Sequence, residues 1–207
     1  MADDKWANPQ KMWDERFAQA EPVYGEQPNA YLRAQTQRLA PGCKILVPGD
    51  GYGRNGIWLA SQGFQVSTVD LSPVGVARAR QSAQTAGLTM SIEQADLASW
   101  TWPASEFDAV AAIFLHLPPV LRTQIHAHML GALKQAGLLI IQAFTPAQLR
   151  HTSGGPKQVE LLYIAEILRK DFVGAEVLEL QEVELEIEEG RMHRGPAAVV
   201  QGVFRKR

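Results

Sequence analysis

The distribution of hydrophobic residues along the chain predicts alternating strands and helices. Short apolar stretches at 45–47, 64–70, 89–94, 107–114 and 138–144 have the length and composition of buried parallel strands. Between them, apolar residues recur at the spacing of amphipathic helices. We therefore expect an α/β fold in which helices join five parallel strands.

The C-terminal part of the chain has a different pattern. Val183, Leu185 and Ile187 alternate with three glutamates between Glu182 and Glu186, which predicts a half-buried strand with an acidic outer face. A turn-rich segment at 188–196 separates it from a last apolar stretch at 197–205. Because the connection is short, the two strands are expected to form an antiparallel hairpin that completes a seven-stranded, mostly parallel sheet with helices on both faces.

The N-terminal residues 1–40 precede the first core strand and are expected to form a helical arm. Helices are predicted at 9–20 and 29–39, and another at 159–171. The arm either folds as a lid over a ligand, with Trp13 and Tyr24 as apolar walls, or simply packs on the sheet. With the core at 41–207, we expect a single domain.

A glycine-rich turn follows the first predicted strand. Its sequence is Gly49-Asp50-Gly51-Tyr52-Gly53, and helical spacing resumes directly after it. Glycines let a ligand lie close to the backbone, and the free N–H groups at the start of the helix point toward it. Asp70, at the end of the second strand, is placed to accept hydrogen bonds from ribose hydroxyls. The alternative is a plain turn with a solvated aspartate.

Two features leave the nucleoside and its contacts open. Asp96 follows the third strand and is placed to accept a hydrogen bond from an adenine amino group, or else to bond its own backbone. Residues 51–56 also satisfy G-x-G-x-x-G, the fingerprint of NAD-binding proteins. The alternatives are therefore an NAD-dependent oxidoreductase and a nucleoside-binding regulatory module without turnover.

Composition and charge narrow the function classes. The 207 residues include 46% hydrophobic residues and carry a net charge of −2, so one well-packed domain is expected and nucleic acid is not an expected partner. The sequence has no apolar run of about 18 residues and no signal peptide, so we expect a cytoplasmic protein without membrane contact. Cys43 is the single cysteine, and His126 and His128 point in different directions on a helix, so no metal site is expected.

His116 follows the fourth predicted strand in the segment His116-Leu117-Pro118. At a strand exit it faces the expected cleft, where it either orients substrate or takes a proton, or else caps or braces the loop.

Motifs along nearly the whole chain resemble those of the class I S-adenosylmethionine-dependent methyltransferases, within them the tellurite-resistance TehB-like group, and more distantly the thiopurine methyltransferases. The matching segments are Trp13-Asp14-Glu15-Arg16-Phe17, Tyr24-Gly25, Gly49-x-Gly51-x-Gly53-Arg54-Asn55, Asp70-x-Ser72, His116-Leu117-Pro118, Gly154-Gly155-Pro156 and Gly190-Arg191-x-His193-Arg194-Gly195.

The resemblance implies a Rossmann-like methyltransferase fold and transfer of a methyl group from S-adenosylmethionine to a small acceptor, such as a thiol, selenium or tellurium compound, with S-adenosylhomocysteine as product. Val47-Pro48 replaces the acid usual in this family before the first glycine, so Asp50 or a backbone carbonyl is the candidate for the methionine ammonium. The protein is expected to be a monomer or homodimer. The resemblance implies catalytic roles for His116, His193 and Arg194. His193 and Arg194 either draw in an anionic or soft acceptor or pair with the acidic strand from Glu182 to Glu189. The implied cofactor contacts come from Trp13, Tyr24, Gly49, Asp50, Gly51, Gly53, Asn55, Asp70, Leu71, Ser72, Asp96, Leu97, Ile113 and Phe114.

Overall fold

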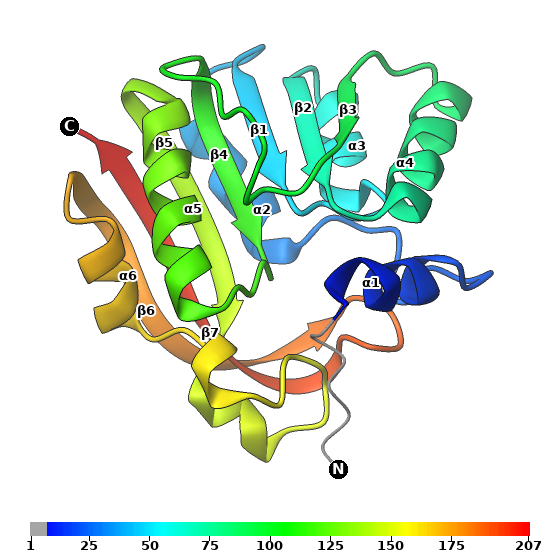
Figure 1. The fold of residues 1–207 in the computed structure, drawn as a ribbon. Coiled ribbons are helices and arrows are strands. Elements are labelled where there is room, and N and C mark those ends of the chain that lie inside the picture. Colours follow the sequence, from blue (N-terminus) through cyan, green and yellow to red (C-terminus); the bar gives the residue numbers. More distant parts are fainter. Residues whose placement is uncertain (1–7) are drawn as a thin grey trace.

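The computed structural model describes residues 8–207 and contains seven strands in one sheet. They are β1 (Lys44–Pro48), β2 (Gln65–Asp70), β3 (Ser91–Gln94), β4 (Phe107–Ile113), β5 (Leu133–Phe144), β6 (Ala175–Glu188) and β7 (Arg194–Lys206). Their order in the sheet is β3-β2-β1-β4-β5-β7-β6 (Figure 1). The neighbours among β1 to β5 pair in parallel, and β7 pairs antiparallel with both β5 and β6. The predicted fold class and the C-terminal hairpin are confirmed.

Between residues 8 and 207, six α-helices connect the strands or precede them: α1 (Pro9–Phe17), α2 (Ala30–Gln35), α3 (Arg54–Ser61), α4 (Pro73–Thr85), α5 (Pro119–Ala132) and α6 (Ala165–Asp171), with short 3₁₀ turns at Thr36–Arg38, Pro146–Arg150 and Val159–Leu161. In Figure 1, α5 and α6 lie in front of the sheet, while α2 and α3 lie behind it.

Each face of the sheet has its own hydrophobic core. Ile125 and Met129 of α5 and Leu168 of α6 pack with Leu46 of β1 on one face. On the other face Leu32 of α2 and Leu59 of α3 pack against Ile45 and Val47. Alternate residues of β1 thus face opposite cores, as expected for a central strand. Because the strands β1 to β5 run parallel, their carboxyl ends meet at one edge of the sheet.

The predicted single helix at 159–171 is wrong. The chain forms a 3₁₀ turn at Val159–Leu161, continues in extended conformation, and becomes helical again only at Ala165. Leu161, Leu162 and Tyr163 are consecutive and all at most 4% exposed. An amphipathic surface helix cannot bury three consecutive side chains, and the N–H of Tyr163 instead donates to the carbonyl of Phe144 at 2.9 Å. The first helix was also predicted too long, because α1 ends at Phe17 rather than at residue 20.

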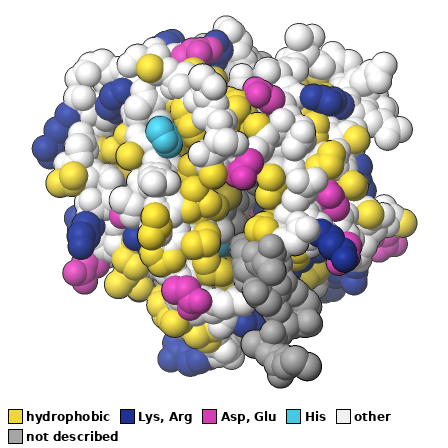
Figure 2. Space-filling view, in the orientation of Figure 1, with side chains coloured by type: hydrophobic (Ala, Val, Ile, Leu, Met, Phe, Trp, Pro, Cys, Tyr) yellow, Lys and Arg dark blue, Asp and Glu magenta, His cyan; other side chains and the backbone are white. Residues whose placement is uncertain are grey.

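The surface carries charges of both signs. Figure 2 shows Lys, Arg, Asp and Glu side chains interspersed around this face, with apolar side chains gathered near its centre. Between residues 8 and 207, the structure has no helix with the length and apolar character that crossing a membrane requires.

Candidate active site

The glycine turn links β1 to α3 through left-handed backbone. Gly49, Gly51 and Gly53 have φ angles of 70, 61 and 87°, a region in which residues with a Cβ are strained. A Cβ on Gly51 would lie 2.6 Å from Cζ of Phe17. The α1 helix therefore packs directly on the bare backbone of the turn, and a side chain at position 51 would displace it.

Asp70 ties the glycine turn to the start of α4. Its Oδ2 accepts the N–H of Gly51 at 2.7 Å, and its Oδ1 accepts the N–H of Ser72 at 2.8 Å. Burial raises the pKa of the Asp70 carboxyl, while these two N–H groups oppose that shift. Ser72 caps α4 by accepting the N–H of Gly75, and its hydroxyl donates to the Asp14 carboxylate of α1.

The Asp50 carboxylate lies under the first turn of α3. Its Oδ2 accepts the N–H of Gly56 at 2.9 Å, and a Cβ on Gly56 would touch both this oxygen and Cγ2 of Thr68 in β2. The other oxygen, Oδ1, is buried without a hydrogen-bond partner among residues 8–207. Burial raises the pKa of Asp50 to about 7, and the N–H of Gly56 opposes that shift. Asp50 borders the cavity, and both candidates for the partner of the methionine ammonium, Asp50 and a backbone carbonyl, stay predictions.

A cavity of about 700 Å³ opens at the carboxyl edge of the strands, between α1, the glycine turn, the end of β4, the loop 152–158 and the turn 191–193. Ten residues predicted for the site border it: Trp13, Tyr24, Gly49, Asp50, Gly51, Asn55, Ile113, Phe114, His116 and His193. The structure therefore brings the glycine turn together with the predicted aromatic walls and both predicted catalytic histidines.

Seven predicted site residues do not border the cavity. Gly53 packs against Ala79 of α4, and Leu97 belongs to the hydrophobic core. Asp70, Leu71 and Ser72 lie at the end of β2 beside α1. The other two are Asp96 and Arg194: Asp96 is exposed and accepts the N–H of Ala98 at 2.9 Å, and Arg194 is exposed 3.9 Å from Glu188. For Asp96, the local backbone contact that was the alternative to the adenine contact is present.

His116 borders the cavity, but the backbone holds both of its ring nitrogens. Nδ1 lies 2.7 Å from the carbonyl of Leu161, to which it donates, and Nε2 accepts the N–H of Phe144 at 3.2 Å. Burial lowers the pKa of His116 to about 4, although the contact with Leu161 opposes that shift. These contacts favour the bracing role over proton transfer.

Aromatic rings surround His193 at the cavity wall. Its ring centroid lies 4.5 Å from that of Tyr24, 4.7 Å from that of Phe114 and 5.4 Å from that of Phe144. Phe114 has a φ of 53°, unusual for a residue with a side chain. Phe114 follows the end of β4, and its ring stacks on that of Phe144 with the ring centroids 4.5 Å apart. Backbone strain at such a position is typical of functional sites.

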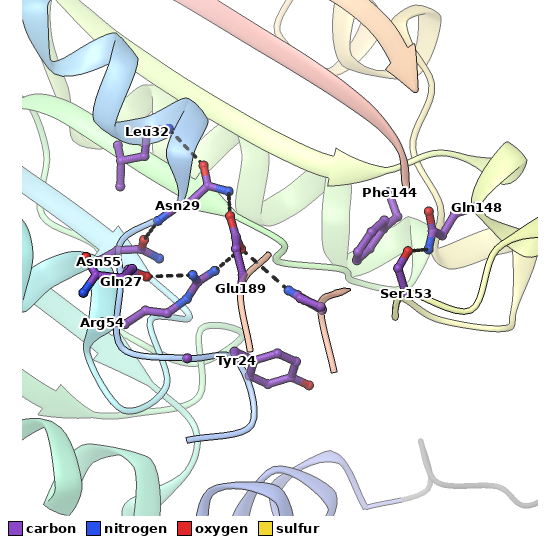
Figure 3. Close-up of polar contacts among 12 residues, drawn as sticks. Tyr24, Gln27, Asn29, Leu32, Arg54, Asn55, Phe144, Gln148, Ser153 and Glu189 are labelled. Atoms are coloured by element: carbon purple, nitrogen blue, oxygen red, sulfur yellow. Dashed lines mark hydrogen bonds and ion pairs between the residues drawn. The ribbon is translucent and has the colours of Figure 1, made fainter. Parts of the chain in front are cut away.

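Glu189 and Arg54 form a buried ion pair that the sequence analysis did not identify. Nη2 of Arg54 lies 2.6 Å from Oε2 of Glu189, and Nδ2 of Asn29 donates to Oε1 at 2.8 Å. Nη1 of Arg54 donates to the carbonyl of Gln27 at 3.0 Å. Figure 3 shows Glu189 between Asn29 and Arg54, so that the arm, α3 and the β6–β7 turn meet at one carboxylate. The only available signal was the Arg54-Asn55 pair after the glycines, since Glu189 resembles the solvated glutamates before it.

The sequence and the fold of this chain are similar to those of known methyltransferases. Residues 45–137 match the family model described as a methyltransferase domain. The thiopurine S-methyltransferase of Bordetella petrii is 28% identical over 163 residues, which cover 67% of this chain and 73% of that protein.

The solved structures that share the fold include a TehB and an N-methyltransferase. TehB from Haemophilus influenzae is 18% identical with a TM-score of 0.71, covering 96% of this chain and 67% of that one. The N-methyltransferase NodS from Bradyrhizobium japonicum, in complex with S-adenosyl-l-homocysteine, is 16% identical with a TM-score of 0.71, covering 96% of this chain and 98% of that one.

Proposed function

Because the chain is a class I S-adenosylmethionine-dependent methyltransferase related to TehB and to thiopurine methyltransferases, we propose that it methylates a small, soft, anionic acceptor such as a thiolate or a selenium or tellurium oxyanion. The matching family model and the Bordetella petrii relative are both methyltransferases, so they do not support the dehydrogenase interpretation of the same glycines.

The charge of the cavity wall carries this proposal. Arg16, Lys157 and Arg191 border the cavity, and the last two are exposed and make no ion pair with any residue from 8 to 207. Of the described residues that border the cavity, Asp50 is the one acid, and its Oδ2 is bound by Gly56 of α3. An anionic acceptor is therefore attracted to this wall, whereas a cationic one is repelled.

The cavity is compatible with the cofactor. Its volume is within the range of small-molecule sites, and the bare backbone at Gly49 and Gly51 leaves room for close approach. We assign the methionine part to the glycine turn and the apolar contacts to Ile113, Phe114, Trp13 and Tyr24. When bound, S-adenosylmethionine supplies a methyl group already activated by its sulfonium.

We assign the ribose to Asp70, which does not border the cavity itself but accepts the N–H of Gly51, a residue that does. Each oxygen of this carboxylate accepts one backbone N–H and retains capacity for a further hydrogen bond. Asp70→Asn is expected to weaken S-adenosylhomocysteine binding about tenfold to a hundredfold, because a charge-assisted hydrogen bond is lost. Isothermal titration calorimetry measures this change. Unchanged affinity in a folded variant would refute the ribose assignment.

His193 is the proposed base for acceptors that arrive protonated. Burial lowers the pKa of His193, with Glu189 opposing and Arg54 adding to that shift, so the ring is neutral near pH 7 and able to take a proton. A thiolate or an oxyanion with a free electron pair attacks a methyl group without such help. Arg194 is exposed and is proposed to attract the anion toward the turn.

The acceptor class is tested with methyl-labelled S-adenosylmethionine and three acceptors: an arylthiol carrying a carboxylate, selenite and tellurite. We expect labelled product from at least one, and we expect Arg191→Gln and Lys157→Gln to raise its KM several-fold. Arg150→Gln is the control, because Arg150 is exposed on the neighbouring loop and pairs with Glu184 at 2.7 Å. Binding of S-adenosylhomocysteine without methylation of any of the three would show that the acceptor class is wrong.

A further inference from the structure

Glu189 differs from the other glutamates of the β6 strand and its turn. Glu182, Glu184, Glu186 and Glu188 are exposed, whereas Glu189 is 8% exposed. Burying a carboxylate costs several kcal/mol unless charges and hydrogen bonds compensate for it. A carboxylate held at this depth beside the cavity is therefore bound by specific partners.

Those partners keep Glu189 ionised and fixed. Burial alone would raise the pKa of Glu189, but His193 and Arg54 outweigh it and lower the pKa to about 2. Both oxygens are engaged, one by Asn29 and the other by Arg54. The carboxylate cannot rotate away without breaking two buried contacts.

His193 presents one ring nitrogen to this fixed charge. Its Nδ1 lies 3.8 Å from Oε2 of Glu189 and is buried without a hydrogen-bond partner. Nε2 lies on the opposite edge of the ring, near Gly154, where a Cβ would come within 3.2 Å of it. Among residues 8–207, no hydrogen bond engages Nε2.

A full negative charge near Nδ1 decides which tautomer is stable. An N–H at Nδ1 is attracted to the carboxylate, whereas a lone pair there is repelled by it. We propose that Glu189 is the positioning residue of the site: it keeps the proton of neutral His193 on Nδ1 and so directs the Nε2 lone pair to the acceptor. This inference rests on the proposed role of His193 in methyl transfer.

The proton balance of the step follows from that tautomer. A protonated acceptor gives its proton to Nε2 while its electron pair forms the bond to the methyl carbon, and the carbon–sulfur bond breaks with its electron pair on sulfur. His193 becomes an imidazolium that Glu189 stabilises, and solvent later takes the proton. An acceptor that is already ionised bypasses the proton transfer.

Other charged or titratable groups near His193 do not replace Glu189 in this role. Arg54 and Arg16 lower its pKa by repulsion. The ring of His116 is fixed with its Nδ1–H on Leu161, and burial raises the pKa of Tyr24 above its ordinary value, so both are neutral near pH 7. Glu189 is thus the group that favours a proton on the His193 ring.

The tautomer is measured directly by nuclear magnetic resonance of ¹⁵N-labelled histidine, with His193→Gln assigning the signal. We expect the Nδ1–H form in the native protein, a substantial Nε2–H population in Glu189→Gln, and no change in Glu188→Gln, whose side chain is exposed. An Nε2–H form in the native protein, or an unchanged tautomer in Glu189→Gln, overturns the proposal. If the single variant does not fold, Glu189→Gln combined with Arg54→Gln removes both charges together.

Kinetics separate positioning from mere structural support. In Glu189→Gln, kcat/KM is expected to fall about tenfold for thiols protonated at the assay pH and to change little for thiols already ionised, with S-adenosylhomocysteine affinity within about twofold. Equal losses for both thiols together with weaker cofactor binding would indicate support only and overturn the proposal. If the native protein methylates no acceptor, the proposed function fails, while the tautomer measurement still tests the role of Glu189.

Discussion

The glycine turn and the β6–β7 turn border the same cavity, and each buries a carboxylate, Asp50 in the first and Glu189 in the second. Asp50 has one backbone N–H and an oxygen without a partner, and burial raises its pKa to about 7. Glu189 has an arginine and an amide, and despite burial its pKa falls to about 2. The two carboxylates are similarly buried, but their pKa values shift in opposite directions because their hydrogen-bond and ion-pair partners differ.

Replacing Arg54, the counter-charge of Glu189, is the strongest test of the difference between the two buried carboxylates. Arg54→Met leaves Glu189 buried without its counter-charge, so we expect the free energy of unfolding to fall by about 3–5 kcal/mol. Urea denaturation measures the change. Combining Arg54→Met with Glu189→Leu is expected to recover most of the loss, because an apolar pair replaces the ion pair. A small effect of Arg54→Met alone would mean that the pair does not stabilise the fold.

The pH dependence of stability distinguishes the two carboxylates. Folding raises the pKa of Asp50 to about 7. The contribution of Asp50 to the free energy of unfolding is therefore complete below its unfolded pKa near 4. This contribution is lost as pH rises toward 7, by about 1 kcal/mol per pH unit. The pKa of Glu189 is lowered to about 2, so its contribution is present above about pH 4.5 and lost as pH falls toward 2.

Asp50→Asn is therefore expected to flatten the stability profile between pH 5 and pH 7, while S-adenosylhomocysteine affinity stays within about twofold, because the amide oxygen still accepts the N–H of Gly56. Urea denaturation at several pH values gives the profile. A large loss of cofactor affinity in this variant would instead assign the methionine ammonium to Asp50, and an unchanged slope would show that Asp50 does not titrate in this range.

The smallest change in stability is expected at the exposed ion pair next to Glu189. Arg194 lies 3.9 Å from Glu188, with both side chains more than 70% exposed. Arg194→Ala should change the free energy of unfolding by less than about 0.5 kcal/mol, because solvent screens exposed ion pairs. Denaturation under the same conditions as Arg54→Met makes the comparison direct. A loss comparable to that of Arg54→Met would remove the distinction between buried and exposed pairs in this turn.

The spacing of hydrophobic residues predicted the strands of the sheet, because this pattern lies within a few neighbouring residues of the sequence. Ile45, Leu46 and Val47 face the two cores of a sheet covered on both sides, so an unbroken apolar run was enough to predict a central strand. The glycine turn was equally predictable, because left-handed backbone requires glycine at that point in the sequence. The helix predicted at 159–171 failed because contacts with β5, far away in the sequence, extend the chain at Tyr163.

The sequence by itself determined the order of strands and helices, the glycine turn and the acids at the strand ends, since each depends on neighbouring residues. Only the tertiary structure decided which of these groups border the cavity. Phe17 packs over Gly51, the backbone occupies both nitrogens of His116, and Glu189 meets Arg54 across 135 positions of sequence. Such contacts depend on the packing of distant segments, for which no local pattern of residues codes.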